Sequence, residues 1–149
     1  MMFKHVLVSL DGSEYALRAL ASAEGLAKLS GARLTLFSVL LRPEDAGALH
    51  VGKLDERSHE HLQAELDALA ATVKERTALD EVDAVVAFGQ PAHQITEYAN
   101  ANGVDLITMS THGLGATGHY AVGSVALKVL MTAACPVFMV RILGHGAPD

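Results

Sequence analysis

Five short apolar runs alternate with four segments of helical periodicity along this 149-residue chain, and this alternation constrains the fold most strongly. The runs are rich in Val, Ile and Leu and occupy residues 6–10, 33–41, 82–88, 104–109 and 137–142. The helical segments cover residues 16–29, 54–76, a stretch that begins at Pro91, and about 124–133. Strands that are apolar on both faces are typical of a parallel sheet with helices on each side. We therefore expect one doubly wound α/β domain over residues 1–143, followed by a flexible tail at 144–149.

Signals at the helix ends support these assignments. Ser13 is a plausible N-cap for the first helix, and Gly31 follows its last turn, where a positive φ is favoured. The second helix is amphipathic, with apolar residues spaced by four, three and four at Leu62, Leu66, Leu69 and Val73. Residues 42–53 contain a Pro and two Gly without periodicity and are predicted to form a loop or a mobile lid.

Composition excludes several classes of protein. The net charge is −6 with no basic cluster, so we expect no nucleic-acid partner. No apolar run approaches the ~20 residues that span a bilayer, and the first residues do not resemble a signal peptide. We expect a soluble, cytoplasmic protein without a membrane partner. The single cysteine, Cys135, excludes an internal disulfide and is predicted to be a packed, inert thiol.

The segments that follow the strands are where a ligand is expected, because open α/β sheets bind at the carboxyl ends of their strands. Residues 110–124 contain four glycines and end at a helix N-terminus, which favours an anion. The stretch is not a P-loop, because no Lys follows its glycines. The sequence leaves two interpretations of this stretch, a phosphate cradle and a plain flexible loop. The turn Gly89-Gln90-Pro91 is too tight to form a binding loop of its own.

Asp11 follows the first strand and suits a ribose hydroxyl or a base edge. Its alternative role is the N-cap of the first helix, and the two roles are compatible. If Asp11 and the glycine-rich stretch serve one ligand, the first and fourth strands are neighbours. This favours the strand order 3-2-1-4-5 over 2-1-3-4-5.

Three motifs together resemble the universal stress protein family, and the resemblance spans essentially the whole chain. They are Leu7-Val8-Ser9-Leu10-Asp11-Gly12-Ser13, then Gly89-Gln90-Pro91, and finally Gly113-x9-Gly123-Ser124 followed by Cys135-Pro136-Val137. The resemblance implies a stress-response sensor or regulator that binds ATP or a related adenine nucleotide. The alternative is a dimeric interaction module of the same family without a nucleotide.

Within the family, the ATP-binding branch is similar to G-x2-G-x9-G-[ST], and this chain departs from it at Ser110 and at Leu114, where many relatives have Arg. The resemblance implies that Asp11 meets the ribose or adenine and that the Val39 backbone bonds the adenine. It also implies a site made of Ser9, Leu10, Asp11, Val39, Met109, Ser110, Gly113, Gly123, Ser124 and Val125. A Mg²⁺ or Mn²⁺ ion would be held mostly by the phosphates.

The fifth strand, from Val137 to Ile142, would form an apolar edge of the sheet, and the resemblance implies that it pairs with a second copy in a homodimer. We expect no enzymatic activity beyond very slow ATP hydrolysis, because no general base or catalytic lysine is evident. His112 and His119 flank glycines and could contact a phosphate or be ordinary polar loop residues. His59-Glu60-His61 lacks metal-ligand spacing and is predicted to be a solvated face.

Overall fold

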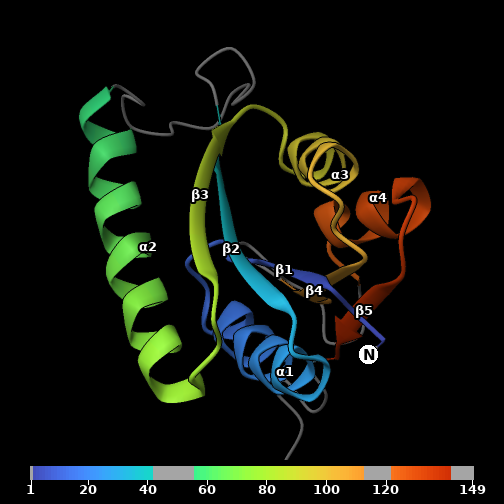
Figure 1. Cartoon of the computed structure of the whole chain (residues 1–149). Coiled ribbons are helices and arrows are strands. Elements are labelled where there is room, and N and C mark those ends of the chain that lie inside the picture. Colours follow the sequence, from blue (N-terminus) through green and yellow to red (C-terminus); the bar gives the residue numbers. More distant parts are fainter. Residues whose placement is uncertain (1, 42–55, 113–121, 142–149) are drawn as a thin grey trace, which may run out of the picture.

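A five-stranded parallel sheet forms the centre of the molecule, in the order β3-β2-β1-β4-β5 (Figure 1). The computed structural model describes residues 2–41, 56–112 and 122–141. In chain order the elements are β1 (His5–Ser9), α1 (Glu14–Ser30), β2 (Arg33–Leu40), α2 (Glu56–Thr77), β3 (Val82–Phe88), α3 (Pro91–Ala101), β4 (Leu106–Ser110), α4 (Ser124–Thr132) and β5 (Val137–Val140). The predicted fold class and strand order are confirmed.

Element boundaries differ from the prediction by one or two residues at most ends. The fifth strand ends at Val140, two residues before the predicted end, where Ser110 of β4 is its last partner in the register. Ile142, the predicted loop at 42–53, most of the predicted cradle at 110–124 and the tail at 144–149 lie outside the described residues.

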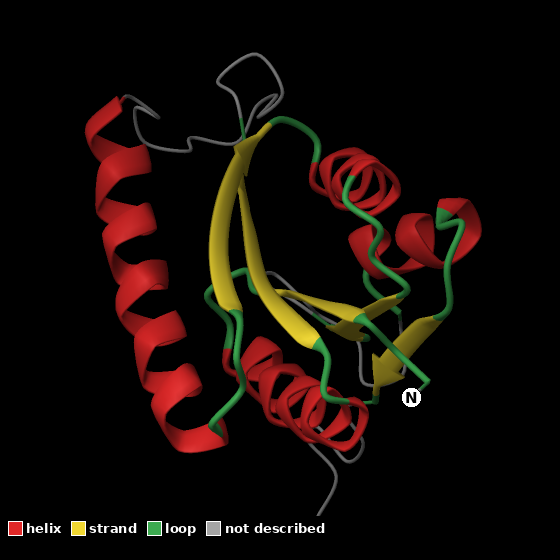
Figure 2. Cartoon of the chain, viewed as in Figure 1, coloured by secondary structure: helices red, strands yellow, loops and turns green. Residues whose placement is uncertain are grey.

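Helices cover both faces of the sheet, as the ribbon in Figure 2 shows. On one face α1 and α2 bury an apolar cluster that includes Val6, Val8, Leu20, Leu34 and Val73. On the other face α3 and α4 bury a second cluster that includes Leu7, Phe37, Ile95, Ile107 and Val129. Side chains of alternate strand residues enter the two clusters, which explains why the strands are apolar on both faces. No helix of the described ranges is both long enough and apolar enough to cross a membrane.

The chain caps its first helix as predicted. The Ser13 hydroxyl accepts a hydrogen bond from the Ala16 amide at 3.2 Å, and Gly31 ends α1 in the left-handed region at φ 66°. Asp11 is therefore not the N-cap. Its carboxylate instead accepts from the Ser13 amide at 2.9 Å, across Gly12, which has a φ of 87°. This turn leads the chain from β1 into α1.

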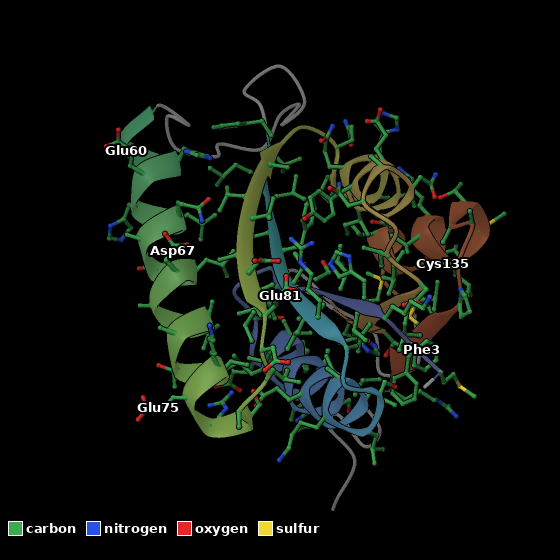
Figure 3. All side chains as sticks on the ribbon, viewed as in Figure 1. Phe3, Glu60, Asp67, Glu75, Glu81 and Cys135 are labelled. Atoms are coloured by element: carbon green, nitrogen blue, oxygen red, sulfur yellow. The ribbon has the colours of Figure 1, made fainter. Side chains whose placement is uncertain are left out.

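The two edges of the sheet differ. At β3 the side chain of Gln63 on α2 donates to the carbonyl of Ala84 at 3.0 Å, so the helix covers this edge. The carboxylates of Glu60 and Glu75 lie on the outer side of α2 (Figure 3). Of the predicted solvated face, Glu60 and His61 are exposed, whereas His59 is half-buried and stacks on Phe88 with ring centres 5.0 Å apart. At the other edge β5 is short and leaves Phe138 42% exposed.

Candidate functional site

The connection that leaves β1 and the connection that leaves β4 run toward opposite edges of the sheet. A pocket of about 300 Å³ lies at the carboxyl ends of these two strands. Its walls come from the ends of β1, β2 and β4, from the start of α3 and from the first turn of α4. The lining residues are Ser9, Leu10, Asp11, Ala16, Val39, Leu41, Pro91, Met109, Ser110, Thr111, His112, Gly123, Ser124, Val125 and Ala126. Every predicted site residue that the structure describes is in this set, and Gly113 lies outside the described residues.

The first turn of α4 supplies backbone N–H groups to the pocket. Its N-cap is Gly123, which has no side chain to bond these amides. The first amides of a helix have no partner within it, so those of Ser124, Val125 and Ala126 are suited to an anion. The Gly123 amide itself is engaged, because it donates to the Thr111 carbonyl at 2.6 Å. Gly123 therefore allows a ligand to approach the backbone closely, but its own amide is not available as a hydrogen-bond donor to that ligand.

Ser110 occupies the position where the resemblance would place a glycine. Its side chain is buried, and its hydroxyl donates a short hydrogen bond to the carbonyl oxygen of His112. The hydroxyl therefore closes the turn that follows β4, and in this arrangement it is directed at the chain instead of at a ligand.

The end of β2 presents a backbone edge to the pocket. Along a parallel strand the N–H and C=O groups of alternate residues face the same neighbour. The carbonyl of Phe37 accepts from the Leu10 amide at 2.8 Å, so the groups of Val39 also face the β1 side, beyond the end of β1. The Leu10 carbonyl lies where the hydrogen-bond ladder between β1 and β2 would continue. It accepts a hydrogen bond from the Ser38 hydroxyl at 2.7 Å instead. A donor and an acceptor side by side match the edge of a nucleobase.

Sequence reasoning missed some of the lining residues. Pro91 contributes to the wall although its turn is too short to bind a ligand alone. His112 is only 6% exposed, which differs from an ordinary polar loop residue. Its Nδ1 lies 3.0 Å from the Thr111 hydroxyl, and its ring centre is 5.9 Å from that of Tyr15 on α1. The sequence indicated His112 as a possible phosphate contact, but its burial against Tyr15 depends on the packing of α1 against β4.

Among the lining residues within the described ranges, the ionisable side chains are those of Asp11 and His112. The described residues contain no group of three His, Cys, Asp or Glu side chains arranged to hold a metal ion. Cys135 lies away from the pocket, before β5 (Figure 3), and burial raises the pKa of its thiol. A raised pKa keeps the thiol protonated and unreactive, in line with the prediction.

Comparison with known proteins gives a consistent result. The model of the universal stress protein family matches residues 2–141. A universal stress protein of Thermus aquaticus, from the QAH/OAS sulfhydrylase 3′ region, is 35% identical over 142 residues, which cover 94% of this chain and 100% of that protein. The universal stress protein YxiE of Bacillus subtilis is 34% identical over 149 residues, with the same shares covered.

Solved structures share the fold. UspA of Lactobacillus plantarum superposes with a TM-score of 0.72 at 28% identity and covers 95% of this chain and 99% of its own. A universal stress protein in complex with cAMP has a TM-score of 0.67 at 22% identity, covering 94% and 98%. One of Archaeoglobus fulgidus in complex with dAMP has a TM-score of 0.69 at 18% identity, covering 93% and 98%.

Proposed function

The chain belongs to the universal stress protein family, and from this premise we propose that it is a stress-response regulator that binds an adenine nucleotide in the pocket between β1 and β4. The proposal rests on one observation: the same pocket contains groups suited to a phosphate and groups suited to a base. The first turn of α4 offers amide donors for a phosphate, and the Val39 backbone offers a donor and an acceptor for a base. Proteins of the same fold hold cAMP and dAMP.

In the proposed complex the adenine and the phosphate of the nucleotide occupy different parts of the pocket. The adenine lies near Val39 and Met109, and the phosphate lies at Ser124 and Val125. Asp11, between them, accepts from a ribose hydroxyl. A Mg²⁺ or Mn²⁺ ion, when bound, neutralises phosphate charge and is held mainly by phosphate oxygens, because Asp11 is the one carboxylate among the lining residues that the structure describes.

We expect a binding protein with at most very slow ATP hydrolysis. The described wall of the pocket contains no lysine to stabilise a transferring phosphoryl group. Turnover faster than about one per second would contradict this expectation.

The test is calorimetry and thermal unfolding with ATP, ADP and AMP, with and without Mg²⁺. A ligand that binds only the native state raises the melting temperature, and a concentration of 100 times Kd stabilises by about 2.7 kcal/mol. Mass spectrometry of freshly purified protein identifies any nucleotide that is retained. If none of the three produces heat or a thermal shift at millimolar concentration, the chain is the non-nucleotide dimeric module of the same family.

We also propose that the protein is a homodimer through β5. The β3 edge is covered by α2, whereas β5 forms the other edge of the sheet and its Phe138 is partly exposed. On α4 the side chains of Leu127, Leu130 and Met131 share one exposed helical face. Light scattering after size exclusion should give twice the chain mass, and F138D should give a monomer. A wild-type monomer at micromolar concentration would overturn the proposal.

A further inference from the structure

The hydrogen-bond ladder between β1 and β2 changes its donor at the edge of the pocket. In a parallel ladder, a residue of one strand bonds two residues of the neighbouring strand, one through its N–H and one through its C=O. The Leu10 amide donates to the Phe37 carbonyl at 2.8 Å, so the regular partner of the Leu10 carbonyl is the amide of Val39. That carbonyl instead accepts the Ser38 hydroxyl at 2.7 Å. A side chain therefore takes the place of a backbone donor at this step.

Ser38 lies on the face of the sheet that α1 and α2 cover. Leu36, two residues before it, belongs to the apolar cluster of that face, whereas Phe37 and Val39 pack in the cluster of the opposite face. The Ser38 side chain is buried, at 6% exposure. Its hydroxyl therefore approaches the Leu10 carbonyl from this face of the sheet and not along the ladder.

The Leu10 carbonyl needs a donor at this position. Leu10 is 7% exposed, and a buried carbonyl without a hydrogen bond destabilises the fold. The register offers the Val39 amide, and the side chain of Ser38 offers a hydroxyl. Because the hydroxyl satisfies the carbonyl, the ladder does not need the Val39 amide, which belongs to a residue of the pocket wall.

We propose that Ser38 is a positioning residue for the base: its hydroxyl holds the Leu10 carbonyl and thereby keeps the Val39 amide available as a donor to the ligand. The inference rests on the proposed nucleotide-binding function and deepens it, because it assigns base recognition to a backbone donor that a neighbouring side chain releases. Adenine carries an amino donor beside a ring-nitrogen acceptor, which is N1 on one edge and N7 on the other. The carbonyl and amide of Val39 are complementary to either edge.

The first experiment needs no ligand. Hydrogen exchange of the free wild-type protein, followed by NMR, should show the Val39 amide exchanging about tenfold faster than the Leu10 amide, which is bonded to Phe37. In S38A the Val39 amide takes over the Leu10 carbonyl, so its exchange should slow by about tenfold. A Val39 amide that is as protected as that of Leu10 in the wild type, or that is not slowed in S38A, overturns the proposal. The wild-type comparison decides the question even if S38A does not fold.

The second experiment is titration calorimetry with adenosine, 1-deazaadenosine and 7-deazaadenosine, since each analogue lacks one of the two ring nitrogens. S38A should weaken adenosine binding about fivefold, because the base then competes with the Leu10 carbonyl for the Val39 amide. One analogue lacks the nitrogen that Val39 bonds, so its affinity should change by less than about twofold. A merely structural role of Ser38 would weaken all three ligands equally. That result, or no loss for adenosine, overturns the proposal.

S30A is the matched control for S38A. Ser30 is buried to a similar degree, at 7% exposure, but it ends α1 at the opposite end of the sheet, where the Arg33 amide bonds the Lys4 carbonyl. S30A should leave the Val39 exchange rate and all three affinities unchanged. If adenosine binds the wild type and S38A equally, the proposed function stands and the role of Ser38 is wrong. If adenosine binds neither, the proposed function fails, and this inference fails with it.

Discussion

The amide nitrogen of Gly123 lies 2.6 Å from the carbonyl oxygen of Thr111 and donates a hydrogen bond to it. The Thr111 amide in turn donates to the carbonyl of Val140 at 3.0 Å. One residue after β4 therefore connects the end of β5 with the start of α4. A Cβ added at Gly123 would lie 3.3 Å from the Thr111 oxygen, so the close approach depends on the absence of a side chain.

The first prediction concerns this contact. In G123A the start of α4 or the Thr111 carbonyl must move by a few tenths of an ångström, and alanine is a poorer N-cap than glycine. We expect a loss of about 1 kcal/mol in the free energy of unfolding and a smaller nucleotide-induced rise in melting temperature. Urea unfolding and thermal shift measure the two effects.

Gly25 provides the matched control for this substitution. It lies exposed within α1, and a Cβ there would meet nothing within 4 Å. G25A should raise the free energy of unfolding by about 0.5–1 kcal/mol through helix propensity and leave nucleotide binding unchanged. Equal effects of the two alanines would contradict the role given to Gly123.

Thr108 carries the second prediction. It is fully buried in β4, and its hydroxyl oxygen has no hydrogen-bond partner within the described part of the chain. A buried polar atom without a partner destabilises the fold, and valine has the same shape without the hydroxyl. T108V should therefore keep or raise stability, by up to about 1 kcal/mol, as measured by urea unfolding.

Thr35 on β2 is the control for Thr108, because it is equally buried but its hydroxyl lies 2.7 Å from Nε2 of His5. T35V removes this partner and leaves a buried imidazole nitrogen unsatisfied. We expect a loss of about 1–3 kcal/mol. If both valine variants are destabilised equally, the Thr108 hydroxyl has a partner after all.

Much of the fold was predictable from local sequence signals. The strands are β-branched runs, Ser13 and Gly31 mark the ends of α1, and Pro91 marks the start of α3. The strand order followed from one functional assumption, that Asp11 and the stretch after the fourth strand share a ligand. The strand ends were less predictable, because β5 ends where its pairing with Ser110 ends and not where its apolar run ends.

The residues of the candidate site were predictable where they belong to a sequence motif. Those whose contacts depend on packing were not. Asp11, Ser124 and their neighbours follow strands, so their position at one sheet edge is a consequence of topology. The engagement of the Gly123 amide and of the Ser110 hydroxyl depends on short contacts between residues of one turn. No spacing rule indicates that these donors bond to the carbonyls of this turn.

A third prediction distinguishes the two roles of the turn before α1, which are to bind the ribose through Asp11 and to start the helix. In D11N the amide oxygen still accepts from the Ser13 amide, so the free energy of unfolding should change by less than about 0.5 kcal/mol. Adenosine and AMP binding should weaken in calorimetry, because the ribose loses a charged acceptor. S13A removes the N-cap bond and should cost about 1 kcal/mol of stability. Unweakened adenosine binding in D11N would exclude Asp11 from the ribose site.

A polar cluster that the sequence did not reveal lies at the opposite end of the sheet from the pocket. His5, at the start of β1, is 5% exposed, and its Nδ1 lies 3.1 Å from the Asn102 carbonyl. The carboxylate of Asp105 accepts from the amides of Lys4 and His5 at 2.8 and 3.0 Å. These bonds join the starts of β1 and β4.

The fourth prediction follows from the protonation of His5. Burial lowers the pKa of this imidazole below the usual 6.5, and Arg33 lowers it further, against the opposing effect of the Asn102 carbonyl and of two nearby carboxylates. The unfolded chain then binds the proton more readily than the native protein does, so stability is lost as the pH falls below about 6.5. Urea unfolding at pH values from about 8 to 5 should show this loss, and H5Q should show a smaller slope over the same range. H61Q, which removes an exposed histidine 3.0 Å from Glu65, is the control and should retain the wild-type slope. A wild-type slope in H5Q would mean that His5 takes up its proton equally in both states.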